Sequence, residues 1–361
     1  MADEEKLLAI RQQIDVLDLQ IQELINQRAA AAKAVAEIKL EENKDAFFYR
    51  PEREAAILKQ VQRRNRGPMG NEEMARLFRE IMSACLALEQ PLKIAYLGPE
   101  GTFTQAAALK HFGHSIITVP LGAISDVFQE VESGSAHYGV VPVENSTEGV
   151  INHTLDMFMR SPLFICGEVS LRIHHHLLSL AADTGHIKRI YSHQQSLAQC
   201  RIWLDRNLPD AEQITVGSNA EAARLAAEEP DSAAIAGEMA AELYRLKGLA
   251  RNIEDEPDNT TRFLVIGRQK AQPSGDDKTS ILCATRNVAG GLSRLLMPLA
   301  QHGISMTRIE SRPSRQGNWD YVFFIDIEGH QDEPAVQKAL RALQDEARLL
   351  KVLGSFPNAV L

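Results

Sequence analysis

The feature that most constrains this chain is a seven-residue repeat of apolar residues near its start, in a stretch with no glycine or proline before Pro51. One row of the repeat carries Leu7, Ile14, Ile21 and Val35, and the other carries Ile10, Leu17, Leu24, Ala31 and Ile38. A sustained heptad pattern predicts one long helix that packs against another helix.

Two shorter helices are predicted after that repeat, over Glu52–Arg64 and Asn71–Leu88, with the breaker Arg66-Gly67-Pro68-Met69-Gly70 between them. Residues 1–91 are therefore expected to form an all-helical domain. The whole chain of 361 residues is too long for one average core, so further domains are expected.

The net charge of the chain is -9, which leaves no positive field to attract nucleic acid or an acidic membrane. Its N-terminus is acidic, and no apolar run approaches the roughly 18 residues that a membrane helix needs. The four cysteines are widely spaced and suggest neither a zinc site nor a disulfide framework. These features predict a cytoplasmic protein without nucleic-acid or membrane partners.

The pattern changes at Pro91 to short apolar runs that alternate with helical stretches, as at Lys93–Leu97, Tyr138–Val141 and Ala233–Ala236. Such alternation predicts an α/β domain with a largely parallel sheet, assigned here to residues 92–270. The segment Ala271–Asp277 has the composition of a flexible linker.

The last domain, residues 278–361, is predicted to be α+β with a ferredoxin-like order of elements. In chain order, the predicted strands and helices are strand Thr279–Thr285, helix Gly290–Gln301, strand Ile304–Glu310, strand Tyr321–Ile327, helix Glu333–Ala347 and strand Leu349–Phe356.

Within the first helix, Arg28 occupies a seam position where an apolar residue is expected. Either an anionic ligand meets this guanidinium, or it snorkels or pairs with a neighbouring acid. Arg11 and Lys39 also flank the seam, but at 1.5 Å per residue they stand about 42 Å apart. One small ligand can meet both cations only if an antiparallel copy of the helix supplies Arg11, which requires a dimer.

These cations, together with Tyr49-Arg50-Pro51-Glu52-Arg53-Glu54 and Glu89, resemble the all-helical chorismate mutases over residues 5–90. The resemblance implies that Arg11 of a partner chain and Arg28 bind the carboxylates of chorismate and that Lys39 binds its ether oxygen. Arg53 and Glu54 would lie near its other polar groups. Arg50 and Glu89 stand where some members have Asp and Gln. Cys85 aligns with a hydroxyl residue near the substrate, although a small buried thiol is the alternative.

Three polar motifs follow predicted strands of the central domain and, with the turn Gly98–Gln105, resemble the prephenate dehydratases over residues 92–267. They are Val141–Gly149, Ser192–Cys200 and Asp258–Phe263. The resemblance implies two α/β lobes like a periplasmic binding protein, no cofactor or metal, and Thr261 as the catalytic residue. The implied substrate-binding residues are Thr102, Asn145, Ser146, Glu148, Ser192, His193, Gln195 and Arg262.

Some residues of these motifs have structural alternatives. Asn145 could cap a turn, and His193 could cap a helix by a hydrogen bond to its backbone. The proton donor is open between Glu148 and His193. The run His174-His175-His176 does not predict a metal site, because consecutive strand residues point to opposite faces.

Two motifs of the last domain resemble the amino-acid-binding motifs of ACT domains: Val288-Ala289-Gly290-Gly291-Leu292 before a helix and Glu310-Ser311-Arg312-Pro313 after a strand. The glycines would let a ligand carboxylate approach helix amides, and Glu310 could receive its ammonium group. The resemblance implies phenylalanine as effector. Alternatively, the glycines only end a loop.

Together the resemblances imply an enzyme that converts chorismate to prephenate and prephenate to phenylpyruvate, under inhibition by phenylalanine, as a homodimer or a tetramer. A different class of protein, a two-lobed ligand-binding or sensory protein that dimerises through its helical and ACT domains, is the alternative. A mutase fused to a prephenate dehydrogenase would need a dinucleotide-binding loop, and the G-x-G-x-x-G spacing is not present at Gly98–Gln105.

Overall fold

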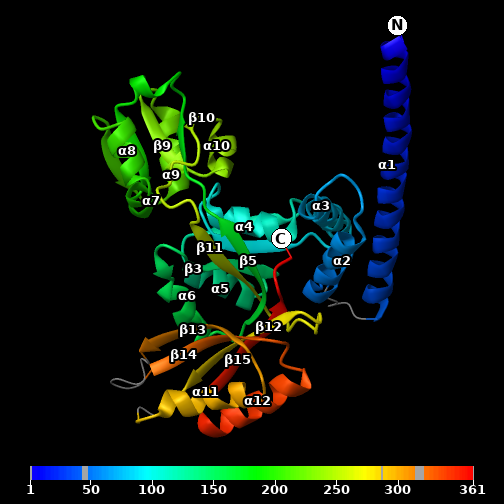
Figure 1. The fold of residues 1–361 in the computed structure, drawn as a ribbon, viewed down its shortest axis with the longest axis vertical. Helices are drawn as coiled ribbons and strands as arrows, with labels where there is room; N and C mark the ends of the chain where they lie inside the picture. Colours follow the sequence, from blue (N-terminus) through cyan, green and yellow to red (C-terminus); the bar gives the residue numbers. More distant parts are fainter. Residues whose placement is uncertain (1, 43–47, 286–287, 314–320, 361) are drawn as a thin grey trace.

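The computed structural model describes residues 2–42, 48–285, 288–313 and 321–360. The helical part consists of α1 (Ala2–Glu42), α2 (Pro51–Arg64) and α3 (Asn71–Glu89). The prediction of one long helix and two shorter ones is thus confirmed, and α2 begins at a proline, whose fixed φ suits the first turn. In Figure 1, α1 stands at the edge of the molecule and its N-terminal half extends away from everything else.

Most apolar residues of the heptad rows of α1 are exposed. Leu7 is 55% exposed, Ile14 50% and Leu24 63%. Only the C-terminal part of the helix lies beside α3, and there Ala36 is buried. An apolar seam of this length is what a helix presents to a partner helix.

The central domain folds into two lobes (Figure 1). Lobe one holds a sheet in the order β2-β1-β3-β11-β5, with β4 paired to β3. Its elements are β1 (Lys93–Leu97), α4 (Phe103–Phe112), β2 (Ile117–Leu121), α5 (Ile124–Glu132), β3 (Tyr138–Asn145), β4 (Gly149–Val150), α6 (Asn152–Phe158), β5 (Phe164–Arg172) and β11 (Thr260–Gly267).

Lobe two holds a second sheet in the order β10-β6-β9-β7-β8. Its elements are β6 (His176–Ser179), η1 (Thr184–His186), β7 (Arg189–His193), α7 (Gln194–Gln199), α8 (Arg201–Asn207), β8 (Glu212–Val216), α9 (Asn219–Glu228), β9 (Ser232–Ala236), α10 (Glu238–Tyr244) and β10 (Lys247–Ala250).

The prediction of a largely parallel sheet is wrong, because both sheets are mixed. Strands β1, β2 and β3 are parallel, but β11 pairs antiparallel with both β3 and β5. In lobe two, β7, β8 and β9 are parallel, and β6 and β10 are antiparallel additions. The chain leaves lobe one through β5 and returns through β11, so these neighbouring strands must run in opposite directions.

Two crossover segments join the lobes, an outgoing one at 173–175 and a returning one at 251–259. They are hydrogen-bonded to each other, since Ile173 N donates to Asn259 O at 2.8 Å and Ile253 N donates to His175 O at 2.9 Å. Paired crossovers of this kind are where a two-lobed protein bends.

The last part of the chain has the predicted β-α-β-β-α-β order and a sheet in the order β13-β14-β12-β15. Its elements are β12 (Asp277–Ala284), α11 (Gly291–Gln301), β13 (Met306–Pro313), β14 (Tyr321–Glu328), α12 (Pro334–Glu346) and β15 (Leu349–Pro357).

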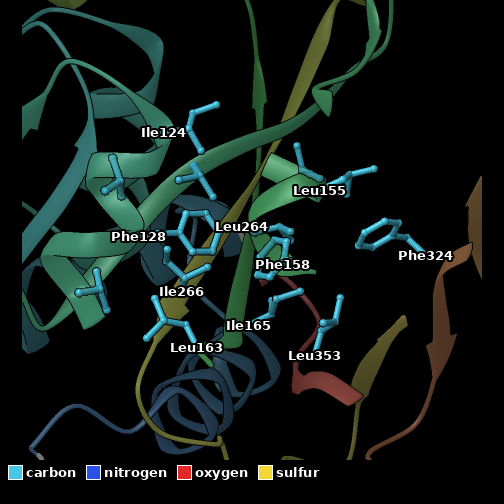
Figure 2. Packing of buried hydrophobic residues seen from close by; sticks show 14 of the residues in the cluster. Ile124, Phe128, Leu155, Phe158, Leu163, Ile165, Leu264, Ile266, Phe324 and Leu353 are labelled. Atoms are coloured by element: carbon cyan, nitrogen blue, oxygen red, sulfur yellow. The ribbon is translucent and has the colours of Figure 1, made fainter. Parts of the chain in front are cut away.

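This last sheet shares a hydrophobic core with lobe one. Figure 2 shows Phe324 and Leu353 from the C-terminal sheet facing Phe158, Ile165 and Leu264 of lobe one, and all five side chains belong to one buried cluster. Burial of such side chains stabilises the contact by about 2 kcal/mol each. The C-terminal part is therefore packed on lobe one rather than tethered beside it.

The expectation of a flexible linker at Ala271–Asp277 is wrong for the same reason. Ala271 and Asp277 are buried, and the Asp277 carboxylate accepts hydrogen bonds from Ser274 N and Gly275 N. Lys59 of α2 holds the neighbouring Asp276 with an N–O distance of 2.8 Å. Polar and glycine-rich composition here builds a compact turn whose partners lie far away in the sequence.

Candidate functional site

Thr261 lies at the start of β11, buried and directly opposite Asn145 at the end of β3. The amide nitrogen of Asn145 donates a hydrogen bond to the Thr261 hydroxyl oxygen at 2.8 Å. Because that oxygen accepts from Asn145, the Thr261 hydroxyl hydrogen is available to donate to a third group.

The orientation of Asn145 is fixed by the backbone that follows it. Its side-chain oxygen accepts from Thr147 N and Glu148 N, both at 3.0 Å. The next residue, Ser146, accepts from Thr260 N at 2.9 Å through its hydroxyl. Asn145 therefore caps a turn, which is the structural alternative stated for it. The same geometry directs its NH2 group toward Thr261.

Three residues that were not predicted as site residues join this pair. Asn259 accepts from Asn145 at 2.8 Å and donates to Gln199 Oε1 at 3.0 Å, and His175 Nε2 lies 2.9 Å from the same oxygen. Asn259 and Gln199 belong to the motifs Asp258–Phe263 and Ser192–Cys200. Their polar amide side chains within these motifs could have identified them as site residues. His175 had no such signal apart from the histidine run.

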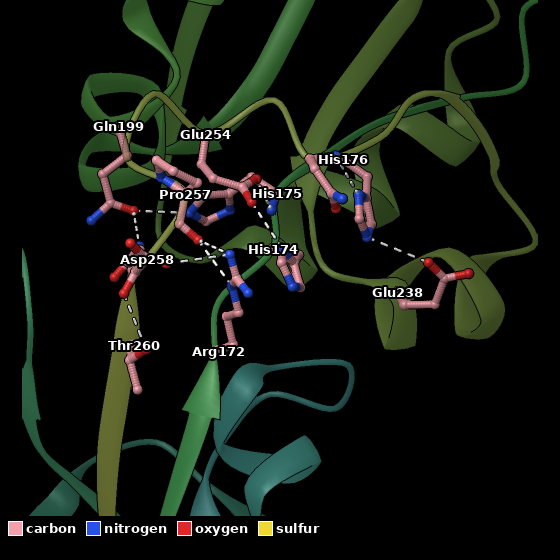
Figure 3. A network of polar contacts seen from close by, with 12 residues as sticks. Arg172, His174, His175, His176, Gln199, Glu238, Glu254, Pro257, Asp258 and Thr260 are labelled. Atoms are coloured by element: carbon pink, nitrogen blue, oxygen red, sulfur yellow. Dashed lines mark hydrogen bonds and ion pairs between the residues drawn. The ribbon is translucent and has the colours of Figure 1, made fainter. Parts of the chain in front are cut away.

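The three consecutive histidines turn to different partners, as Figure 3 shows. His174 meets Glu254 at 2.8 Å, His175 meets Gln199, and His176 meets Glu238 at 3.4 Å. Among the described residues, no group of three His, Cys, Asp or Glu side chains is placed to hold a metal ion.

Lobe two contributes Ser192 and His193 at the end of β7. Ser192 is buried, and its hydroxyl lies 3.0 Å from both Asn219 Oδ1 and Ile235 O. His193 caps α7, since its Nδ1 accepts from Gln195 N at 3.4 Å, which is the structural alternative stated for it. The side chain of Gln195 is exposed.

Helix α7 links the two lobes at this point. At its end, Gln199 Nε2 lies 3.3 Å from both Thr147 Oγ1 and Glu148 Oε1 of lobe one. On the β1 side, the Thr102 hydroxyl donates to Pro99 O at 3.0 Å at the start of α4. The turn after β1 lines an open cavity of about 800 Å³ that also reaches Gly217, Ser218 and Glu221 of lobe two.

The structure places Arg262 away from Thr261, because neighbouring residues of a strand point to opposite faces. Its guanidinium pairs with Glu168 at 2.8 Å and with Asp326 of the C-terminal sheet at 2.6 Å. Burial disfavours the charged guanidinium, but these two carboxylates outweigh burial and raise the pKa of Arg262. Arg262 therefore belongs to the contact between lobe one and the C-terminal sheet.

In the helical part, Arg28, Lys39 and Glu89 come together. Burial raises the pKa of Glu89, although the nearby charges of Lys39 and Arg28 act to lower it. Lys39 also lies 5.4 Å from the ring centre of Phe48, which is buried. The half-buried carboxyl group of Glu89 on α3 thus lies within the electrostatic influence of two cations of α1.

The other predicted residues of the helical part differ in their surroundings. Arg11 and Arg53 are exposed, and Cys85 is buried on α3. Glu54 pairs with Arg79 at 3.2 Å and, with His111 and Cys166 of lobe one, lines a small cavity. Burial raises the pKa of Glu54 despite the lowering effect of Arg79.

The two predicted motifs of the C-terminal part lie at the start of α11 and on the edge strand β13. Gly290 has φ +74°, a conformation that favours glycine, and Gly291 is buried, whereas Leu292 is exposed. On β13, Glu310 is half-buried and Ser311 is exposed. Arg312 pairs with Asp156 of α6 at 2.7 Å.

Comparison with known families divides the chain in the same way as these sites. Residues 10–90 match the family model of chorismate mutase type II, residues 94–271 match prephenate dehydratase, and residues 279–345 match the ACT domain. None of the helices in the described part of the chain has the length and apolar character to span a bilayer.

Similar proteins agree with these matches. A bifunctional chorismate mutase/prephenate dehydratase of Pseudomonas aeruginosa is 59% identical, and the alignment covers 100% of both chains. The crystal structure of a prephenate dehydratase from Arthrobacter aurescens in complex with L-Phe is 33% identical with a TM-score of 0.68, covering 74% of this chain and 90% of that one.

A solved structure described as a novel type of quorum quenching acylase is also similar, at 29% identity and a TM-score of 0.69 over 74% of this chain and 98% of that chain. A shared fold does not fix the reaction, so the helical part and the full-length match decide the assignment. On that evidence, the chain belongs to the family of bifunctional chorismate mutase/prephenate dehydratases.

Proposed function

We propose that this chain catalyses two consecutive reactions and is regulated by phenylalanine. Residues 1–91 rearrange chorismate to prephenate, residues 92–270 convert prephenate to phenylpyruvate, and residues 278–361 bind phenylalanine. The observation that carries the proposal is the Thr261–Asn145 pair, which leaves a hydroxyl hydrogen free at the junction of the lobes. Four unpaired, buried cysteines suit the reducing cytoplasm, where we place the enzyme.

In the mutase reaction, no covalent step is needed. Arg28 binds carboxylate, Lys39 donates to the ether oxygen, and Glu89 in its protonated form donates to the same oxygen as negative charge develops there. The charges of Lys39 and Arg28 act on the carboxyl group of Glu89, which supports placing the three residues in one site. Arg53, Glu54 and Cys85 are proposed to contact the remaining groups of chorismate once the partner chain completes the site.

The partner chain is a second copy of this one, which supplies Arg11. The exposed apolar rows of α1 support a homodimer, because an antiparallel copy of the helix would cover them and bring its Arg11 to the Arg28–Lys39 interval. The edge strand β13 offers a further pairing surface, through which dimers could form tetramers.

In the dehydratase reaction, prephenate loses its ring carboxylate as carbon dioxide, and its ring hydroxide leaves as water after taking up one proton. Thr261 donates its free hydrogen to the leaving oxygen, and Glu148 or His193 supplies the proton. Thr102, Asn145, Ser146, Ser192 and Gln195 line the substrate. Arg262 supports the strand that carries Thr261 through its ion pairs rather than through a substrate contact.

Phenylalanine is proposed to bind at the start of α11. Gly290, Gly291 and Leu292 would receive its carboxylate at the helix amides, and Glu310 would receive its ammonium group. Ser311 and Arg312, which follow Glu310 on β13, would complete the site. The glycine conformation at residue 290 supports this location, and the L-Phe complex of the 33% identical dehydratase supports phenylalanine as the ligand.

The test is to incubate the purified full chain with chorismate and to follow prephenate and phenylpyruvate, with and without phenylalanine. We expect phenylpyruvate to appear with no added cofactor, and less of it when phenylalanine is present. Failure to convert either chorismate or supplied prephenate would contradict the proposal and favour a two-lobed binding protein.

A further inference from the structure

Five polar side chains form one continuous chain of contacts across the junction of the lobes. In order they are His175, Gln199, Asn259, Asn145 and Thr261, with successive distances of 2.9, 3.0, 2.8 and 2.8 Å. His175 lies in the outgoing crossover, Asn259 in the returning crossover and Gln199 at the end of α7. Figure 3 shows the contact between His175 and Gln199.

The donors and acceptors along this chain follow from the backbone contacts of Asn145. Because two backbone N–H groups occupy its oxygen, its NH2 group must be the donor to Asn259 and to Thr261. Asn259 therefore accepts through Oδ1 and donates through Nδ2 to Gln199 Oε1. The oxygen of Gln199 is then an acceptor, and His175 must donate to it from Nε2.

His175 is buried in the junction, where its ring has Gln199 as its one hydrogen-bond partner among the described residues. It is 1% exposed, its backbone N–H donates to Glu254 Oε2 at 2.9 Å, and its ring packs edge-on against Phe103. Its other ring nitrogen, Nδ1, has no hydrogen-bond partner among the described residues. A neutral ring with hydrogen on Nε2 fits these contacts, because a buried N–H without a partner costs more than a buried lone pair.

Gln199 contacts lobe one through its NH2 group. With its oxygen occupied by Asn259 and His175, Gln199 must present its NH2 group to Thr147 and Glu148 of lobe one. Asn259 in turn holds one hydrogen of the Asn145 NH2 group, so that the other points at Thr261.

We propose that His175 and Asn259 are positioning residues of the dehydratase, which act through Gln199 and Asn145 to hold Thr261 as a hydrogen-bond donor toward the substrate. This inference rests on the proposed dehydration of prephenate and adds two residues to it. Neither residue needs to transfer a proton.

Paired substitutions at His175 separate this role from simple packing. His175→Phe keeps a ring against Phe103 but removes the donor, whereas His175→Gln removes the ring but places an NH2 group near the position of Nε2. We expect His175→Phe to lower kcat for prephenate about tenfold, with KM changed less than threefold, as loss of one buried hydrogen bond allows. His175→Gln should stay within threefold of the original enzyme.

A packing role predicts the opposite order, with His175→Gln the more damaged variant, and that order would overturn the proposal. So would a pH profile of kcat that loses a limb in His175→Gln, because it would make His175 a proton-transfer group. The groups that face His175 and could contribute to that profile are Glu254, His174 and His176. Circular dichroism and thermal unfolding check that both variants fold.

Asn259→Asp supplies an independent test. An aspartate at this position can still accept from Asn145, but it cannot donate to Gln199. We expect kcat to fall about tenfold or more, and normal turnover would contradict the role of Asn259. Mutase activity and the original enzyme are measured in parallel: an original chain that does not dehydrate prephenate would refute the proposed function, whereas an active original with normal variants would refute this inference alone.

Discussion

Arg262, which follows Thr261 directly in β11, lies 2.6 Å from Asp326 of the C-terminal sheet. Asp326 is buried and also accepts from Ser280, while Arg262 holds Glu168 on its other side. A second ion pair joins Arg308 of β13 to Glu144, the residue before Asn145, at 2.7 Å. The C-terminal sheet thus holds both strands that carry the Thr261–Asn145 pair.

This contact predicts that Asp326→Asn weakens inhibition by phenylalanine. The substitution leaves Glu168 as the ion-pair partner of Arg262. A movement of the C-terminal sheet would then displace β11 less. We expect the concentration of phenylalanine that halves dehydratase activity to rise severalfold, and the protein to lose about 1–3 kcal/mol of unfolding free energy.

The matched control is Asp332→Asn, which changes the same chemical group at a site where the side chain is 58% exposed and faces His330. It should leave both stability and inhibition unchanged. A folded Asp326→Asn enzyme with unaltered phenylalanine sensitivity would refute transmission through this ion pair.

Thr261→Ala is expected to lower kcat for prephenate by a factor of about 10² to 10³, the range found when one donor to a developing negative charge is removed. Thr261→Ser keeps the hydroxyl and should retain more activity. The neighbouring Thr260→Ala is the control, because the Thr260 hydroxyl donates to Asp258 O at 3.1 Å. Equal losses at positions 260 and 261 would show a general effect on the strand.

Arg28→Ala is expected to lower mutase turnover at least about 100-fold, because it removes the cation that we propose binds a substrate carboxylate. Dehydration of supplied prephenate should persist, since the Thr261 site lies in another part of the chain. Steady-state assays of both reactions on one preparation make the comparison. Parallel loss of both activities in a folded variant would mean that the two sites are not separate.

We expect Glu89 to make the mutase activity depend on pH. Only the protonated acid can donate to the ether oxygen, so turnover should fall as pH rises through the pKa of Glu89. Burial raises that pKa, which extends the active range upward from the ordinary glutamate range near 4.3. Glu89→Gln always donates and should flatten the profile. A profile that falls equally in this variant would assign the titration to another group.

Sequence patterns alone were sufficient for the helices and for the order of elements in the last domain, because period and breakers are local signals. They were insufficient for the mixed sheets, since the direction of β5 and β11 depends on where the chain crosses between lobes. Arg262 shows the same limit at the site. Its place in a motif suggested a substrate contact, but strand alternation and Asp326, 64 residues away in sequence, direct it to an interface.

His175 shows that limit from the other side. The histidine run raised only the question of a metal site, which strand geometry argued against. The actual partner of His175 is Gln199, which lies 24 residues further along the chain. The buried Nδ1 of His175, without a hydrogen-bond partner in the described part of the chain, distinguishes it from His174 and His176, which pair with Glu254 and Glu238, and the local pattern does not encode this property.

The final prediction concerns the start of α11. Gly291→Val should weaken phenylalanine inhibition at least tenfold, because the added side chain would occupy the space in which a ligand carboxylate approaches the helix amides. The substitution is made in the full chain, since removal of the C-terminal part would expose the core that it shares with lobe one. Basal dehydration should change little, because residue 291 lies outside the proposed catalytic site.

Binding measurements complete that test through reciprocity. If phenylalanine weakens prephenate binding by some factor, prephenate must weaken phenylalanine binding by the same factor, and Gly291→Val should reduce both effects together. Isothermal titration of each ligand in the presence and absence of the other measures the two factors. Full inhibition of Gly291→Val, with phenylalanine competing directly against prephenate, would place the effector in the catalytic cleft, where its ring and carboxylate resemble those of the substrate.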